Sequence, residues 1–215
     1  MRRRWTRRPA TGRSSRRRNT FCWPSAMPAN LFVFMGLIAS GKSTLARGLA
    51  SRFSLPCFNT DVVRKELAGK APESRQGSPL HQGIYTPAFS RLTYDALLEH
   101  ARRELARNQS VVLDGSYHKR GERQLVVQCA AACGASLLFI LCRCDDEETE
   151  RRLAVRARNP HAVSDGTWDI FLRQKESFEF PDELPASSLL VFETNGPPPQ
   201  QLQKLINALP KTFRP

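Results

Sequence analysis

Short apolar runs alternate along the chain with longer stretches in which apolar residues recur at helical spacing. Residues 30–35, 110–114, 136–142 and 188–192 are runs rich in Val, Leu, Ile and Phe, and residues 56–60 form a shorter run. Runs of this length and composition predict buried β-strands. Because strands and helices alternate throughout, we expect a three-layer α/β fold, in which helices cover both faces of a parallel sheet.

The remaining stretches show the helical pattern or no pattern. Helices are predicted over residues 43–53, 61–68, 88–108, 121–133, 146–158, 164–175 and 200–209. The apolar face of the longest helix comprises Phe89, Leu92, Tyr94, Leu97, Leu98, Ala101 and Leu105. Residues 70–86 contain two prolines and two glycines, so we expect a long mobile loop there.

One predicted loop carries a specific motif. Residues 36–43 (GLIASGKS) fit the pattern Gly-x4-Gly-Lys-Ser, between the first predicted strand and the first predicted helix. In this setting, backbone N–H groups and the positive end of the helix surround a phosphate, Lys42 reaches the β- and γ-phosphates, and Ser43 places its hydroxyl on Mg²⁺. The expected nucleotide contacts are Gly36, Ala39, Ser40, Gly41, Lys42, Ser43 and Thr44. The motif predicts a nucleoside-triphosphate site; the structural alternative is a turn with a solvated lysine.

Positive charge is concentrated near the N-terminus. The 215 residues carry a formal net charge of +13, but residues 1–26 contain nine arginines and no acid. Without them, 24 basic and 20 acidic residues remain, a balance of +4. We therefore divide the chain into a disordered arginine-rich tail, residues 1–26, and one α/β domain, residues 27–215.

The tail has three interpretations. It is an arm for nucleic acid or another anionic surface, or an export signal, or the product of a start assigned upstream of Met27. The export signal is disfavoured because the only apolar run that follows, Leu31 to Ala39, contains the phosphate loop.

Neither a membrane span nor a disulfide framework is indicated. No apolar stretch approaches the ~18 residues that a transmembrane helix needs. Six cysteines in a chain with a nucleotide site suggest free thiols in a reducing, cytoplasmic compartment. The pairs Cys129/Cys133 and Cys142/Cys144 are close in sequence, as zinc ligands are. However, the second pair lies on an apolar strand and no histidines have ligand spacing, so free thiols are favoured.

Asp114 is the first candidate for chemistry outside the loop. An acid at the carboxyl end of a buried strand points into the crevice where such sheets bind ligands, and there it can hold Mg²⁺ opposite Ser43. The alternative is a carboxylate that caps the turn. Gly115 and Ser116 follow Asp114, where a hydrolytic ATPase would carry a glutamate. Transfer to a bound acceptor is therefore favoured over hydrolysis.

Asp61 and Arg64 form a second candidate pair. Asp61 begins a predicted helix, and Arg64 lies one turn later on the same face. A kinase needs a base for the proton of the acceptor hydroxyl and a cation that orients the acceptor. The alternative is a helix cap followed by a solvated arginine.

Two groups of cations complete the candidates. The predicted helix 146–158 carries Arg151, Arg152, Arg156 and Arg158. Arg152 and Arg156 share a face and suit phosphoryl oxygens, although pairing with Glu147 and Glu148 is an alternative for Arg151 and Arg152. A further group follows Asp114. Lys119, Arg120 and Arg123 are expected to face an anionic acceptor from the mouth of the site, with solvated loop charges as the alternative.

Taken together, these segments resemble the small P-loop kinase family, and particularly its polynucleotide-kinase-like ATP-binding proteins. The resemblance is carried by Gly36–Thr44, Asn59–Leu67, Val111–Gly115, Arg152–Arg156 and Ser164-Asp165. It implies a five-stranded parallel sheet of nucleoside-kinase-like order, with the Asp114 strand beside the strand that precedes the loop. It also implies that Asp61 activates the acceptor, Arg64 positions it, Arg152 and Arg156 close over ATP, and Asn195 lies near the adenine.

The sequence thus predicts an ATP- and Mg²⁺-dependent phosphotransferase in which Lys42, Asp61, Arg64, Arg152 and Arg156 are catalytic. The acceptor stays open between a small-molecule hydroxyl and a polynucleotide 5′-hydroxyl. Nucleic-acid grooves usually add stacking aromatics, and Trp168 is the only tryptophan outside the tail. A nucleotide-dependent switch or binding module with slow hydrolysis is the rival hypothesis.

Overall fold

The computed structural model of the chain describes residues 28–71, 83–158 and 167–214. The arginine-rich tail, most of the predicted loop 70–86 and the Ser164-Asp165 segment lie outside these ranges. The division of the chain at residue 26 therefore stays a prediction.

The sheet has five parallel strands in the order β2-β3-β1-β4-β5. The strands are β1 (Asn30–Met35), β2 (Cys57–Asn59), β3 (Val111–Asp114), β4 (Ser136–Arg143) and β5 (Leu189–Glu193). Asp114 is paired with Phe34 of β1 on one side and with Asn59 of β2 on the other. The predicted fold class and the position of the Asp114 strand are confirmed.

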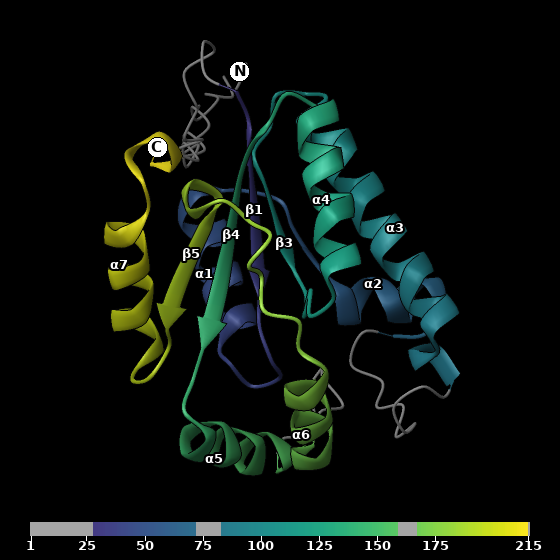
Figure 1. Ribbon diagram of the computed structural model, residues 1–215, viewed down its shortest axis with the longest axis vertical. Coiled ribbons are helices and arrows are strands. Elements are labelled where there is room, and N and C mark those ends of the chain that lie inside the picture. The colour runs from purple at the N-terminus through teal and green to yellow at the C-terminus, as the bar shows by residue number, and fades with distance from the viewer. Residues whose placement is uncertain (1–27, 72–82, 159–166, 215) are drawn as a thin grey trace, which may run out of the picture.

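Helices cover both faces of the sheet (Figure 1). They are α1 (Lys42–Phe53), α2 (Thr60–Leu67), α3 (Pro87–Leu105), α4 (Arg120–Ala132), α5 (Asp146–Ala157), α6 (Trp168–Ser177) and α7 (Pro198–Ala208), with 3₁₀ turns at Gly83–Tyr85, Ala186–Ser188 and Lys211–Phe213. In Figure 1, α1 and α7 lie on one face, α3 and α4 on the other, and α5 and α6 lie beyond the arrowheads of β4 and β5. The carboxyl ends of β4 and β5 thus point toward these two helices.

Alternation along β1 explains the two layers of core. Leu31, Val33 and Met35 pack in the cluster that includes α3 and α4 side chains. Phe32 and Phe34 pack in the opposite cluster, which includes α1 and α7 side chains. Successive side chains of a strand point to opposite faces, and a strand covered on both faces reads as a continuous apolar run.

The predicted apolar face of the longest helix is wrong at one position. Leu92 is 58% exposed, whereas Thr93 is fully buried. The Thr93 hydroxyl donates to the carbonyl of Phe89 at 2.9 Å, which satisfies its polar group within the helix. A threonine that bonds to its own helix can therefore occupy a core position that hydrophobicity alone assigns to leucine.

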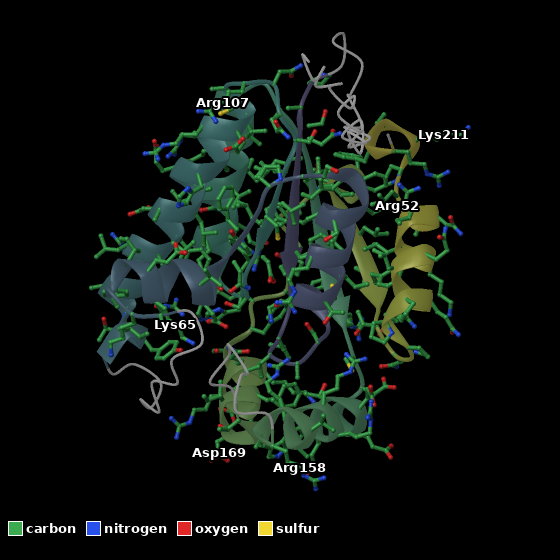
Figure 2. The ribbon with its side chains drawn as sticks, turned by 180° about the vertical axis from the view of Figure 1, so that it is seen from behind. Arg52, Lys65, Arg107, Arg158, Asp169 and Lys211 are labelled. Carbon is green, nitrogen blue, oxygen red and sulfur yellow. The ribbon has the colours of Figure 1, made fainter. Side chains whose placement is uncertain are left out.

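The described part of the chain contains free cysteines and no candidate metal cluster. The five cysteines in the described ranges are free thiols, and no three His, Cys, Asp or Glu side chains gather there as at a metal site. Within the same ranges, no helix combines the length and apolarity needed to cross a bilayer. Figure 2 shows Arg52, Arg107, Arg158 and Lys211 at widely separated places on the outside of the molecule.

Candidate active site

The loop between β1 and α1 has a backbone that only particular residues allow. Gly36 has φ +135°, and a Cβ atom built there would lie 2.4 Å from the carbonyl oxygen of Cys142. Gly41, the N-cap of α1, has φ 83°. Glycine tolerates both the positive φ and the close backbone approach. The first N–H groups of α1 lack partners within the helix, so the loop presents donors suited to a phosphate.

Lys42 lies at the start of α1 and faces this loop. Its ammonium donates to the carbonyl of Leu37 at 3.1 Å. Burial lowers the pKa of Lys42, while the negative charges of Asp114 and Asp61 oppose that change and Arg156 adds to it. Asp61, Asp114 and Arg156, which were predicted from separate segments, therefore all act on the Lys42 ammonium.

Asp114 lies at the carboxyl end of β3 and is 1% exposed. Its Oδ2 accepts a 2.5 Å hydrogen bond from the Asn59 amide, and its buried Oδ1 has no hydrogen-bond partner among the described residues. Burial raises the pKa of Asp114, opposed by the charge of Lys42 and by the neighbouring Ser43 and Asn59 side chains. A buried carboxylate oxygen without a partner beside a hydroxyl suits Mg²⁺, which takes oxygen ligands. Asp114 and Ser43 therefore fit the predicted metal.

Asn59 is a site residue for which no role was predicted. Its Oδ1 accepts from the backbone N–H groups of Asp61 at 2.9 Å and Val62 at 3.1 Å, which caps α2. Its amide nitrogen holds Asp114. An asparagine just before a helix is a cap signal that can be recognised in a sequence. The bond from Asn59 to Asp114 cannot be recognised in this way, because it depends on the pairing of β2 with β3. One side chain thus links the helix that carries Asp61 to the strand that carries Asp114.

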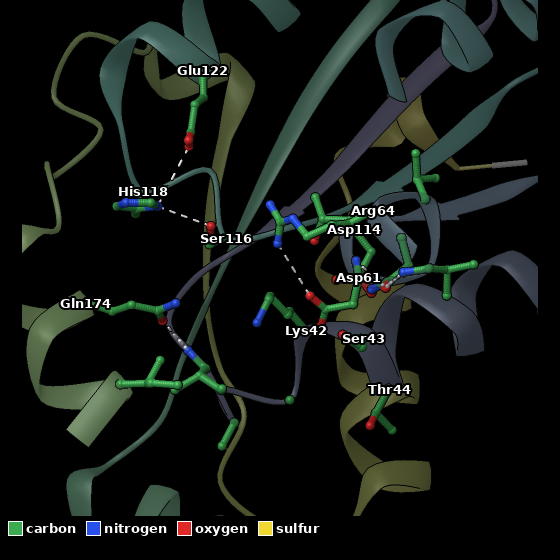
Figure 3. A pocket seen from close by; sticks show the side chains of 18 of the residues that line it. Lys42, Ser43, Thr44, Asp61, Arg64, Asp114, Ser116, His118, Glu122 and Gln174 are labelled. Atoms are coloured by element: carbon green, nitrogen blue, oxygen red, sulfur yellow. Dashed lines mark hydrogen bonds and ion pairs between the residues drawn. The ribbon is translucent and has the colours of Figure 1, made fainter. Parts of the chain in front are cut away.

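Asp61 and Arg64 lie on one face of α2, as expected. Arg64 Nη1 is 3.8 Å from Asp61 Oδ1, and the arginine is 8% exposed. The guanidinium lies over the Tyr85 ring at 5.0 Å and bonds Ser90 Oγ at 3.4 Å. Its buried Nε has no hydrogen-bond partner among the described residues. Figure 3 shows Asp61 and Arg64 beside Lys42 in the pocket.

The two arginines of α5 have different surroundings. Arg152 donates to Glu148 at 2.8 Å, to the carbonyl of Ala39 at 3.2 Å and to the carbonyl of Thr194 at 2.6 Å. It therefore ties the phosphate loop to the end of β5. Arg156 lines the cavity, and its guanidinium forms no hydrogen bond or ion pair with another described residue. Burial lowers the pKa of Arg156, and the charge of Asp61 opposes this.

Asn195 hydrogen-bonds to Asp145. Its amide donates to Asp145 Oδ2 at 2.6 Å, and its Oδ1 accepts from the Asp145 backbone N–H at 3.4 Å. Asn195 lines a small hollow beside Pro197, next to the main cavity. Its expected place near an adenine stays a prediction.

The expectation that Lys119, Arg120 and Arg123 face an anionic acceptor is wrong for the two arginines and unsupported for the lysine. Arg123 is fully buried and pairs with Glu183 at 2.6 Å; Arg120 pairs with Asp182 at 2.5 Å. Lys119 lines the cavity, but its ammonium lies 3.2 Å from Glu179. The acids come from a segment about 60 residues downstream that sequence spacing does not connect to α4, so the cations stabilise the fold here.

A polar network on another side of the cavity also escaped the sequence reasoning. Tyr94 Oη lies 3.0 Å from Ser116 Oγ, which lies 3.1 Å from His118 Nδ1. His118 Nδ1 is 3.8 Å from Glu122 Oε2 (Figure 3). Burial raises the pKa of Glu122 to about 7, opposed by a hydrogen bond from the Lys119 backbone and by the charges of Arg123 and Arg64. The four residues are scattered over α3, the β3–α4 turn and α4, so only folding brings them together.

The network lines one cavity of about 2260 Å³ together with Lys42, Asp61, Arg64, Asp114 and Arg156. Side chains reach it from the phosphate loop, α1, α2, α3, the β3–α4 turn, α5 and α6. Single small-molecule sites are about 300–1,000 Å³. The cavity therefore has room for a nucleotide and a second substrate side by side.

This sheet order, with a phosphate loop after the central strand, defines the fold of P-loop kinases. A sugar kinase from Janibacter sp. HTCC2649 shares it with TM-score 0.61 and 20% identity, over 84% of this chain and 94% of that one. A putative kinase from Chloroflexus aurantiacus has TM-score 0.62 and 18% identity, over 86% and 100%. Kti12 of Chaetomium thermophilum, in complex with ADP-AlF3, has TM-score 0.61 and 20% identity, over 84% and 99%. At these identities the likeness shows the fold.

The family model AAA_33, an AAA domain, matches residues 31–181. The match covers more than half of the chain, so the chain belongs to the AAA_33 family. The uncharacterized protein Rv2004c of Mycobacterium tuberculosis is 30% identical over 118 residues, which are 55% of this chain and 24% of that protein. The matched part is thus about a quarter of this curated relative. The resemblance to small P-loop kinases is confirmed.

Asn59→Ala is predicted to weaken both the fold and the metal site. Loss of the α2 cap should lower the free energy of unfolding by about 0.5–2 kcal/mol. Loss of the bond that orients Asp114 should reduce the Mg²⁺-dependent part of nucleotide affinity about 10–100-fold. Urea unfolding and calorimetric titration of ATP with Mg²⁺ or EDTA measure the two effects.

The matched control is Thr86→Ala. The Thr86 hydroxyl caps α3 by accepting from the Phe89 N–H at 3.3 Å, away from Asp114. This variant should lose comparable stability and keep its Mg²⁺-dependent affinity. Equal metal dependence in Asn59→Ala and the wild type would contradict the role given to Asn59.

Glu122→Gln is predicted to change how stability depends on pH. The pKa of Glu122 rises from 4.5 to about 7 on folding, so the folded state binds its proton more tightly. Its contribution is fully present below pH 4.5 and is lost as the pH rises through about 7. The glutamine cannot ionise, so the variant should gain stability relative to the wild type between about pH 5 and pH 8.

Urea unfolding of Glu122→Gln and of the wild type at about pH 5 and about pH 8 measures this difference in stability. The other charged groups near Glu122 are His118, Lys119, Arg123 and Arg64, and both proteins contain them. Glu150→Gln on the exposed side of α5 is the control and should show no such trend. A constant difference between Glu122→Gln and the wild type would contradict the pKa assignment.

Proposed function

We propose that this protein is an ATP- and Mg²⁺-dependent phosphotransferase that moves the γ-phosphate to a hydroxyl group of a bound acceptor. The observation that carries the proposal is that Asp61 lies in the same cavity as Lys42, Asp114 and Arg156 and acts electrostatically on each of them. Transfer to a hydroxyl group needs a base near the phosphate loop, whereas nucleotide binding alone does not.

The phosphate loop would bind the donor. Its glycines permit the close approach of backbone N–H groups, and Lys42 would leave the carbonyl of Leu37 to contact the β- and γ-phosphates. Ser43 and Asp114 would hold Mg²⁺, which, when bound, neutralises charge on the phosphate oxygens. Arg152 would keep the loop in place, because its donors are already used by Ala39, Thr194 and Glu148.

The acceptor would lie on the α2 side of the loop. Asp61 would accept the proton of the attacking hydroxyl, and its carboxylate is kept in place by the N-terminal turn of α2 and the ion pair with Arg64. Arg156 would stabilise charge on the transferred phosphoryl group, since burial leaves its guanidinium poorly solvated. Catalysis of this kind depends mostly on positioning and electrostatics.

The fold relatives support the same class of activity. A sugar kinase, a putative kinase and a gluconokinase from Sinorhizobium meliloti share the fold. We propose a cytoplasmic enzyme, since ATP is used there and all five cysteines in the described part of the chain are free.

Asp61→Asn is predicted to bind ATP as the wild type does but to lose about 10²–10⁴-fold in phosphoryl transfer, because the amide cannot accept the proton. The measurement is transfer of labelled γ-phosphate from ATP by the full chain across a panel of sugars, polyols, sugar acids and 5′-hydroxyl oligonucleotides. Lys42→Ala serves as the blank.

Asp169→Asn is the matched control, because Asp169 is exposed on α6 and lies outside the cavity. It should transfer phosphate at the wild-type rate. Undiminished transfer by Asp61→Asn would show that Asp61 is not the base. ATP turnover without label on any acceptor would contradict the phosphotransferase itself.

A further inference from the structure

Helix α6 presents one face to the cavity, and no role was predicted for that face. It comprises Ile170, Arg173, Gln174 and Ser177, all of which line the cavity. Residues three and four positions apart lie on the same side of a helix, so α6 turns a continuous strip toward the site. Gln174 is the member of this strip whose side chain hydrogen-bonds to the phosphate loop.

A small core of its own holds α6 against the phosphate loop. Phe171, which is 2% exposed, belongs to one apolar cluster with Ile38 and Ala39 of the loop and Leu153 of α5. Gln174 follows Phe171 by three residues and is half-buried. Packing of this kind fixes the position of a helix. The place of Gln174 beside the loop is therefore part of the fold.

A single peptide group joins Gln174 to Lys42. The carbonyl of Leu37 accepts from the Lys42 ammonium at 3.1 Å. The N–H of Ile38, which belongs to the same planar peptide group, donates to Gln174 Oε1 at 2.9 Å. Figure 3 shows Gln174 and Lys42 extending toward one another over the loop. Gln174 therefore lies beside the ammonium that is expected to contact the β- and γ-phosphates.

The bond to Ile38 fixes which way the amide of Gln174 is turned. A backbone N–H can only donate, so the amide oxygen must face Ile38 and the amide nitrogen must lie on the other side. That nitrogen carries two N–H groups. It forms no hydrogen bond within the described ranges, although the side chain lines the cavity. Gln174 thus offers two donors to a ligand beside Lys42.

A glutamine supplies more than the bond to Ile38 requires. A glutamate here would accept from the Ile38 N–H equally well, but it would place a negative charge beside the phosphate loop. The glutamine keeps the acceptor and adds neutral donors next to the cation Lys42. Hydrogen bonds to a charged group are stronger than those between neutral groups. An anion with several oxygen atoms is therefore the ligand that these donors fit.

We propose that the Gln174 amide contacts the γ-phosphate of the bound nucleotide and so distinguishes a triphosphate from a diphosphate. The proposal rests on the nucleotide site of the phosphotransferase proposed above. A diphosphate ends at the β-phosphate, which the backbone N–H groups of a phosphate loop and its lysine already bind. The γ-phosphate adds oxygen atoms that need further donors, and Gln174 supplies them from α6. This contact favours the substrate ATP over the product ADP.

Calorimetric titration of the full chain in excess Mg²⁺ tests this contact without catalysis. The two ligands are ADP and the non-hydrolysable triphosphate β,γ-imido-ATP. Gln174→Glu keeps the acceptor for the Ile38 N–H, loses the donors and adds a negative charge. It should bind the triphosphate about tenfold or more weakly than the wild type does, the loss expected for a hydrogen bond to a charged group. It should bind ADP like the wild type.

Gln203→Glu is the matched control, because Gln203 is exposed on α7 and its amide bonds Asn207 outside the cavity. It adds the same charge and should bind both nucleotides like the wild type. Gln174→Met removes the acceptor together with the donors, and it should still lose more affinity for the triphosphate than for ADP. If Gln174 only held the loop, each Gln174 variant would change the affinity for both ligands by the same factor. That result would overturn the proposal.

Failure of this contact and failure of the phosphotransferase are distinguishable. Label transfer by the wild type, together with an unchanged preference for triphosphate in Gln174→Glu, would reject the contact and leave the proposed function standing. A selective loss of triphosphate binding in Gln174→Glu, with no acceptor labelled by the wild type, would support the contact and contradict the transfer reaction. A wild type that bound neither nucleotide would overturn both.

Discussion

The contact between Asp114 and Asn59 is the interaction on which the site depends. It joins the carboxyl end of β3 to the cap of α2, so the predicted metal ligand and the predicted base are held by one amide. A carboxylate that is 1% exposed is unfavourable as an ion unless its surroundings supply positive charge and hydrogen bonds. Lys42, Ser43 and Asn59 supply them in part, and the unpaired Oδ1 leaves a place for a cation.

The phosphate loop is held from both sides. The Gly36 N–H donates to the Ser116 carbonyl, which ties the loop to the turn after β3. On the other side, Arg152 bonds the Ala39 and Thr194 carbonyls, and the Thr194 hydroxyl donates to the Ser40 carbonyl at 2.6 Å. These hydrogen bonds preorganise the loop, and they occupy the donors of Arg152 and Thr194. Arg156, which lies on the same face of α5, is left to act on the ligand.

Much of the fold follows from the sequence because its strands are buried on both faces. β1 and β4 read as continuous apolar runs, and the glycine-bounded motif lies at the turn after β1, so the sheet, the loop and the place of Asp114 at the end of its strand were all predictable. The pair Asp61 and Arg64 was also predictable, since three residues on a helix span one turn. These inferences use only local spacing and burial.

The rest required contacts between distant segments. Nothing near Arg123 in the sequence indicates that Glu183 will neutralise it, and hydrophobicity alone assigns Leu92 to the core in place of Thr93. Spacing indicates that Arg152 can pair with Glu148 and that Arg156 cannot, but only the fold shows that Arg152 also bonds the carbonyls of Ala39 and Thr194. The network around Glu122 has no sequence signal, because its members are polar residues that lie 22 and more positions from Tyr94.

The proposed site requires that Asp114 and Ser43 hold the metal that accompanies the nucleotide. The most direct measurement is electron paramagnetic resonance of Mn²⁺, used in place of Mg²⁺, with the full chain and ADP, in the wild type and in Asp114→Asn. We expect nucleotide-dependent Mn²⁺ binding that weakens about tenfold or more in the variant, with metal-free ADP affinity retained. Equal Mn²⁺ binding by the two proteins would contradict it.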